Sequence, residues 1–123
     1  MVKVLIVDDE EMVRMVIANT LRKVGITVEE AENGRAAILR FQEDPADVVI
    51  TDIIMPEQEG IETIIELKRM SPTVKIIAMS GGGRVGTTDY LEIARDFGAN
   101  RIFTKPFDRM KVLEAVYECL TEQ

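Results

Sequence analysis

Acidic side chains follow two apolar segments of this 123-residue chain. Asp8 and Asp9 come directly after the apolar residues 2–7, and Asp52 ends the apolar residues 47–52. Like charges that cluster raise at least one carboxyl pKa strongly unless a cation neutralises them, and oxygen-only ligands suit a hard divalent ion such as Mg²⁺. The three aspartates therefore predict a Mg²⁺ site, provided that the fold brings them together.

A hydroxyl and an amine end two further apolar segments, at Ser80 and Lys105. Together with the carboxylates they form a set suited to phosphoryl chemistry: metal and lysine neutralise phosphoryl oxygens, the hydroxyl binds another oxygen, and one carboxylate acts as nucleophile. A cis bond between Lys105 and Pro106 could aim the lysine into this site, but sequence leaves the isomer open. For Glu10 or Glu11 we favour a different role, capping of the following helix.

Short β-branched segments alternate with longer helical patterns along the whole chain. The expected strands are residues 2–7, 27–32, 47–52, 74–80 and 101–105. The first, third and fourth are almost continuously apolar, which is typical of parallel strands covered on both faces. The expected helix limits are Gly25 after the first helix, Asn33 before the second, Pro72 after the third, Thr87 or Thr88 and Gly98 around the fourth, and Asp108 before the fifth.

Five βα units predict an α/β fold, (βα)5, with a doubly wound, five-stranded parallel sheet of flavodoxin-like order 2-1-3-4-5. We expect one domain spanning residues 1–123. In this order the winding reverses between the first and third strands, and ligands bind beside their carboxyl ends. The fold therefore predicts that Asp8, Asp9 and Asp52 converge at the edge where Ser80 and Lys105 also lie.

The composition excludes several classes of function. Fifteen Lys and Arg against 22 Asp and Glu give a net charge of −7, which argues against direct binding of nucleic acid or an anionic membrane. The chain has no His and only Cys119, so it lacks imidazole-based catalysis and intrachain disulfides. The apolar start is too short for a signal peptide or a membrane span, and we expect a cytoplasmic protein.

Motifs at the strand ends resemble, in order, those of the receiver domain of bacterial two-component response regulators. They read VLIVDDE, VVITDIIMP, IIAMSG and FTKPF. The resemblance implies that Asp52 accepts a phosphoryl group from a phosphohistidine on a sensor histidine kinase. It further implies that Mg²⁺ binds to Asp9, Asp52 and the backbone carbonyl of Ile54, with Asp8 acting through water, and that Ser80 and Lys105 hold the phosphoryl oxygens.

The same resemblance implies a signalling domain that catalyses only its own phosphorylation and slow dephosphorylation. The fourth helix, fifth strand and fifth helix would then switch to signal to a downstream protein or output domain, and dimerisation on phosphorylation is compatible with this. One residue departs from the family pattern: Ile102 stands where an aromatic switch residue is usual. Phe103, one residue later, is expected to face the other side of the sheet.

Three alternatives stay open at this point. Gly81, Gly83 and Gly86 spell a dinucleotide-binding G-x-G-x-x-G, although Thr104 and Lys105 stand where that fold needs an acid. An aspartate-nucleophile hydrolase would usually carry Asp-x-Asp on its nucleophile strand, whereas two aspartates are adjacent here. A degenerate receiver that binds partners without phosphorylation is disfavoured by the complete set of site residues.

Overall fold

Within residues 2–53, 60–81 and 87–122, which this computed structural model describes, five parallel strands alternate with five helices. The strands are β1 (Lys3–Val7), β2 (Thr27–Ala31), β3 (Val48–Asp52), β4 (Lys75–Gly81) and β5 (Arg101–Lys105). They form one sheet in the order β2-β1-β3-β4-β5, so the predicted topology is confirmed. The strand limits also agree with the predicted segments to within one or two residues.

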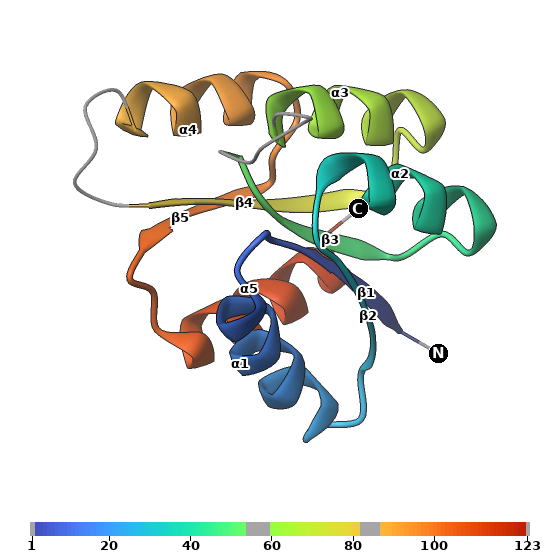
Figure 1. Cartoon of the computed structure of the whole chain (residues 1–123), viewed down its shortest axis with the longest axis vertical. Helices are drawn as coiled ribbons and strands as arrows, with labels where there is room; N and C mark the ends of the chain where they lie inside the picture. The colour runs from blue at the N-terminus through green and yellow to red at the C-terminus, as the bar shows by residue number, and fades with distance from the viewer. Residues whose placement is uncertain (1, 54–59, 82–86, 123) are drawn as a thin grey trace.

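The helices cover both faces of the sheet, as Figure 1 shows: α1 and α5 lie on one face, and α2, α3 and α4 lie on the other. They are α1 (Glu11–Arg22), α2 (Gly34–Glu43), α3 (Gly60–Met70), α4 (Thr87–Asp96) and α5 (Arg109–Thr121). Asn33 and Asp108 cap α2 and α5 by accepting hydrogen bonds from the backbone N–H of Ala36 and Met110. Gly25 follows α1 with a φ of 84°, a left-handed conformation that glycine adopts without strain.

The buried apolar residues form two clusters, one on each side of the sheet. Alternate residues of β1 enter different clusters: Leu5 packs on the side of α2, α3 and α4, whereas Ile6 packs on the side of α1 and α5. The same alternation separates Ile102, which packs against the first cluster, from Phe103, which packs against the second. The expectation that these two neighbours face opposite sides is therefore confirmed.

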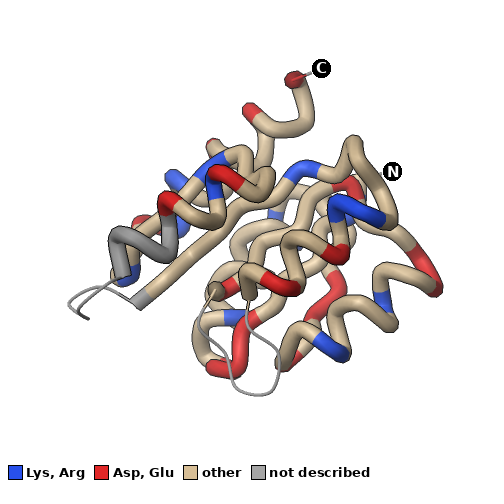
Figure 2. The backbone as a smooth tube through the Cα atoms, turned by 90° about the horizontal axis from the view of Figure 1, so that it is seen from above, with Lys and Arg blue, Asp and Glu red and all other residues tan. Residues whose placement is uncertain are grey.

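The outer surface mixes both signs of charge. Lys and Arg lie interspersed with Asp and Glu along the backbone in Figure 2. Among the described residues, no helix combines the length and the apolar character that crossing a membrane requires.

Candidate functional site at the carboxyl edge of the sheet

The neighbouring strands β1 and β3 deliver two buried carboxylates to the same edge. Their register pairs Val7 with Thr51, so Asp8 and Asp52, the residues that follow, emerge side by side. Asp8 is 0% exposed and Asp52 is 5% exposed. Two acids at this depth require a nearby positive charge, since a buried carboxylate without a partner is costly.

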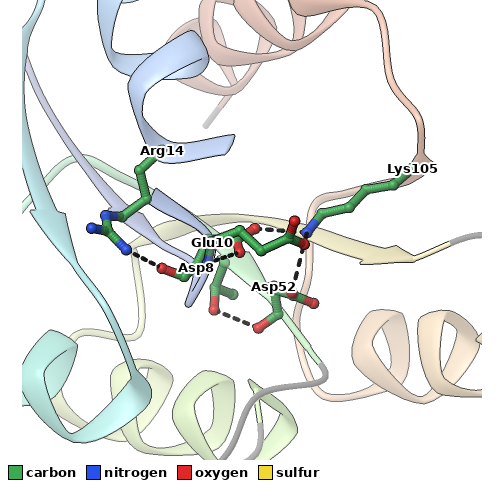
Figure 3. Close-up of polar contacts among 6 residues, drawn as sticks. Asp8, Glu10, Arg14, Asp52 and Lys105 are labelled. Carbon is green, nitrogen blue, oxygen red and sulfur yellow. Dashed lines mark hydrogen bonds and ion pairs between the residues drawn. The ribbon is translucent and has the colours of Figure 1, made fainter. Parts of the chain in front are cut away.

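Lys105, the last residue of β5, supplies a positive charge. Its Nζ lies 2.8 Å from Asp8 Oδ2 and 3.2 Å from Asp52 Oδ2, so one ammonium bridges both carboxylates (Figure 3). The Lys105–Pro106 peptide bond is cis, which answers the question that sequence left open. The structure thus brings together three of the residues that the sequence had singled out.

The pKa shifts at this site show that Lys105 only partly compensates the acids. Burial raises the pKa of Asp8, and hydrogen bonds from Lys105 and from the Glu10 backbone N–H offset that rise only in part, while the charge of Asp52 adds to it. Burial by itself would lower the pKa of Lys105, but its hydrogen bonds and charge attraction to Asp8 and Asp52 outweigh burial and raise it. Lys105 therefore stays protonated at neutral pH, and the site can accommodate further positive charge.

Two exposed acids extend the cluster toward solvent. Carboxylate oxygens of Asp8, Asp9 and Glu10 lie within 4.8 Å of one another. Hard oxygen donors at this spacing, beside a carboxyl whose pKa burial has raised, fit a divalent cation such as Mg²⁺. Ile54, whose backbone carbonyl the family resemblance implies as a further ligand, lies outside the described residues.

The prediction that Glu10 caps α1 is wrong. Glu10 stands at the N-cap position, but its side chain makes no capping hydrogen bond. Its carboxylate instead lies 3.5 Å from Lys105 Nζ. The physical reason is reach, because capping favours the short side chains of Ser, Thr, Asp and Asn, whereas the longer Glu side chain extends past the backbone N–H groups. Glu11 does lie in the first turn of α1, where its charge suits the helix dipole.

Arg14 also takes part in the site, although no sequence motif singled it out. Its Nη1 donates a hydrogen bond of 2.7 Å to the backbone carbonyl of Asp8 (Figure 3), and its Nε donates one of 3.3 Å to Glu30. Arg14 lies one turn into α1 and Glu30 lies on β2, so the contact depends on how the two elements pack. Together they hold the segment that carries Asp8 and Asp9.

Ser80 lies near the end of β4, beside the carboxyl end of β3. The register pairs Asp52 with Met79, the residue before Ser80. Ser80 is fully buried, and its Oγ has no hydrogen-bond partner among the residues that the structure describes. A buried hydroxyl without a partner costs free energy, so Oγ is available to a ligand oxygen. Residues 82–86, which carry most of the glycine motif, lie outside the described part of the chain.

An open groove begins beside Lys105 and runs along α1. It has a volume of about 540 Å³, and its lining residues are mostly apolar: Glu10, Met12, Val13, Val16, Lys105, Pro106 and Phe107. Met12 is 65% exposed, which is unusual for a large apolar side chain. The groove thus places an apolar surface next to the charged site.

Comparison with known proteins assigns this arrangement to a family. A sequence profile of the response regulator receiver domain matches residues 4–117. The chemotaxis protein CheY of Thermotoga maritima is 38% identical over 115 residues, which cover 93% of each chain. CheY of Bacillus subtilis is 38% identical over 119 residues, covering 96% of this chain and 97% of the relative. The structure of Vibrio cholerae CheY4 matches with a TM-score of 0.85 at 28% identity, over 97% of this chain and 98% of that one. The chain therefore belongs to the response regulator receiver domain family of two-component signalling, as its strand-end motifs predicted.

Proposed function

We propose that this receiver domain accepts a phosphoryl group on Asp52 from a phosphohistidine of a sensor histidine kinase. An oxygen of the Asp52 carboxylate forms a bond to phosphorus while the bond from phosphorus to the donor imidazole nitrogen breaks. The electron pair of that bond stays on the imidazole, and Asp52 becomes an acyl phosphate. The observation that supports this proposal most is that Asp52 meets Lys105 beside Ser80, whose buried Oγ has no described partner.

Each remaining site residue has a role in this reaction. Lys105 balances the negative charge that the phosphoryl oxygens bring, and the Ser80 hydroxyl donates a hydrogen bond to one of them. Asp9, Asp52 and the Ile54 carbonyl would hold Mg²⁺ directly, with Asp8 acting through water. The chemistry that Mg²⁺ supplies when bound is neutralisation of the phosphoryl oxygens. Arg14 keeps the backbone at Asp8 in place.

The groove beside Lys105 supports a protein as the phosphoryl donor. Its apolar lining from Met12 to Phe107 suits a folded partner better than a small polar molecule, and it adjoins the acceptor site. We propose that the kinase docks here, in the cytoplasm. Signalling domains of this family are not enzymes in the usual sense, because the domain itself is the substrate.

We place the output on the other side of the site, at the surface of α4, β5 and α5. Phosphorylation adds charge and acceptor oxygens near Ser80, which favours a rearrangement at the end of β4. Because Ile102 replaces the usual aromatic switch residue and packs under α2, α3 and α4, the readout would depend on the end of β4 and on α4. The partner would be a downstream protein, an output domain or, after phosphorylation, a second copy of the chain.

Incubation with acetyl phosphate and Mg²⁺, followed by intact mass measurement, tests the proposal. The expected result is a gain of one phosphoryl group that requires Mg²⁺ and is absent from Asp52→Asn. Equal labelling of Asp52→Asn, or no labelling of the wild type, would contradict it. Repeated turnover of a small phosphoester would favour a hydrolase.

A further inference from the structure

Glu10 lies at the position where the charged site meets the groove along α1. Its side chain is 64% exposed, whereas those of Asp8 and Asp52 are 0% and 6% exposed. Glu10 also lines the groove together with Lys105. A molecule that approaches the site through this groove therefore meets the Glu10 carboxylate before it meets the two buried aspartates.

The backbone of Glu10 is fixed while its carboxylate is available for contacts. Its N–H donates a hydrogen bond of 2.9 Å to Asp8 Oδ1, and its φ and ψ of −91° and 111° are extended. The side chain makes no capping hydrogen bond to α1. Among the described residues, the cation that its carboxylate contacts is Lys105, whose Nζ lies 3.5 Å away. Glu10 is thus the third carboxylate at this ammonium, and the most exposed of the three.

The contact with Lys105 opposes the proposed role of that lysine. A phosphoryl group on Asp52 needs the Lys105 ammonium, which Glu10 also attracts. A carboxylate at the entrance also repels an approaching anion, and this repulsion grows with the charge of the anion. Competition for the Lys105 ammonium and repulsion of the donor both slow phosphoryl transfer to Asp52.

We propose that Glu10 screens phosphoryl donors by charge, by competing for the Lys105 ammonium and by repelling the more negative donors. This inference rests on the proposed function, since it concerns the donors of the same site. It predicts that the Glu10 carboxylate raises the ratio of the labelling rate with phosphoramidate to the labelling rate with acetyl phosphate. The reason is that phosphoramidate carries less negative charge at neutral pH.

The test compares Glu10→Gln with Glu11→Gln at saturating Mg²⁺ for each protein. Both variants remove one negative charge from neighbouring positions, but only Glu10 is within ion-pair distance of Lys105. Glu10→Gln is expected to speed labelling by acetyl phosphate about two- to fivefold, which is the range that an exposed ion pair supports. Labelling by phosphoramidate should speed up by a smaller factor. The difference between donors should shrink as salt rises. Glu11→Gln should change both rates by less and equally.

A second measurement needs neither metal nor donor. The ¹⁵N signal of the Lys105 side-chain ammonium in the metal-free protein should shift in Glu10→Gln and stay in place in Glu11→Gln. The inference would be overturned if acetyl phosphate labelled Glu10→Gln no faster than the wild type, or if Glu11→Gln were accelerated equally. Either result would leave the proposed function standing. Absence of labelling in the wild type would overturn both, whereas the ammonium signal would still report the pairing.

Discussion

Two clusters centred on a lysine lie at opposite edges of the sheet and differ in the burial of their carboxylates. Lys3 begins β1, and its Nζ lies 2.8 Å from Glu29 Oε1 and 2.8 Å from Asp44 Oδ2, whose side chains are 29% and 74% exposed. Lys105 ends β5 and pairs with three carboxylates: Asp8 and Asp52 are 0% and 6% exposed, and Glu10 is 64% exposed. The two lysines are about equally exposed, at 13% and 14%, so the difference lies in the carboxylates: only the carboxyl edge has two that are almost fully buried.

The difference explains which edge is suited to chemistry. At the amino edge, water screens the pair between Lys3 and Asp44, whose side chain is 74% exposed, so this pair contributes little to stability. At the carboxyl edge, burial raises the pKa of Asp8 and leaves the Ser80 hydroxyl without a described partner. The proposed binding of a cation and a phosphoryl group would relieve these costs, so these ligands would stabilise this edge more than the other.

The largest expected effect comes from adding a side chain at Gly60, where α3 begins close to the end of β3. Gly60 begins α3 against the end of β3, and an added Cβ would lie 2.2 Å from Ile53 Cα and 2.4 Å from the Asp52 carbonyl oxygen. Because both neighbours are backbone atoms, Gly60→Ala must displace β3 or α3, at a cost of about 3 kcal/mol in the free energy of unfolding. Chemical denaturation measures this cost, and labelling of Asp52 should fall as well.

Gly25→Ala is the matched control, because an added Cβ there meets no atom within 4 Å. Its positive φ still carries a conformational cost of about 1 kcal/mol. Equal losses in the free energy of unfolding would contradict this prediction, because the close backbone approach at Gly60 would then add no cost.

Removal of the bridging lysine should come next in size. Lys105→Met leaves two buried carboxylates without their ammonium, and we expect a loss of about 2 kcal/mol at neutral pH. Added Mg²⁺ should restore part of this loss, because it replaces the missing charge. The loss should also shrink in acid, where protonation neutralises the carboxylates. A loss that depends on neither Mg²⁺ nor pH would mean that Lys105 acts only by packing.

Asp8→Asn should stabilise the protein. Because the pKa of Asp8 is raised above its ordinary value of 3.8, the folded chain binds more protons than the unfolded chain just above pH 3.8, and stability falls as pH rises through this window. The variant escapes this penalty, so its Tm should exceed that of the wild type by about 4 °C at pH 7, or about 1 kcal/mol. The advantage should vanish as pH falls to 3.8. A Tm difference that is constant with pH would contradict this account.

The smallest effect is expected at the amino edge. Lys3→Met removes a lysine whose two carboxylate partners are 29% and 74% exposed, so the free energy of unfolding should fall by only about 0.5 kcal/mol. Salt should remove most of the difference between variant and wild type. Thermal melts at low and high salt provide the measurement, and a loss equal to that of Lys105→Met would erase the distinction between the edges.

Much of the fold could be predicted from the sequence because hydrophobic periodicity and helix-capping residues are local features of the chain. The strands, the caps at Asn33 and Asp108 and the order of the sheet all follow from short stretches of residues. The opposite directions of Ile102 and Phe103 follow from strand alternation.

Side-chain direction in the site was harder to predict. The sequence placed Asp8, Asp52 and Lys105 at one edge, but it assigned Glu10 to capping because it cannot show where a long exposed side chain turns. Arg14 escaped notice because its contacts with Asp8 and Glu30 depend on how α1 packs on β2. These contacts come from tertiary structure rather than from spacing along the chain.

The most direct test of the account is the position of the phosphoryl group after labelling with acetyl phosphate. Reduction of the labelled protein with borohydride, followed by peptide mapping, identifies the modified residue. The account predicts that the phosphoryl group is an acyl phosphate on Asp52 and that hydroxylamine removes it. A stable phosphoester on Ser80, or an acyl phosphate on Asp8 or Asp9, would contradict it.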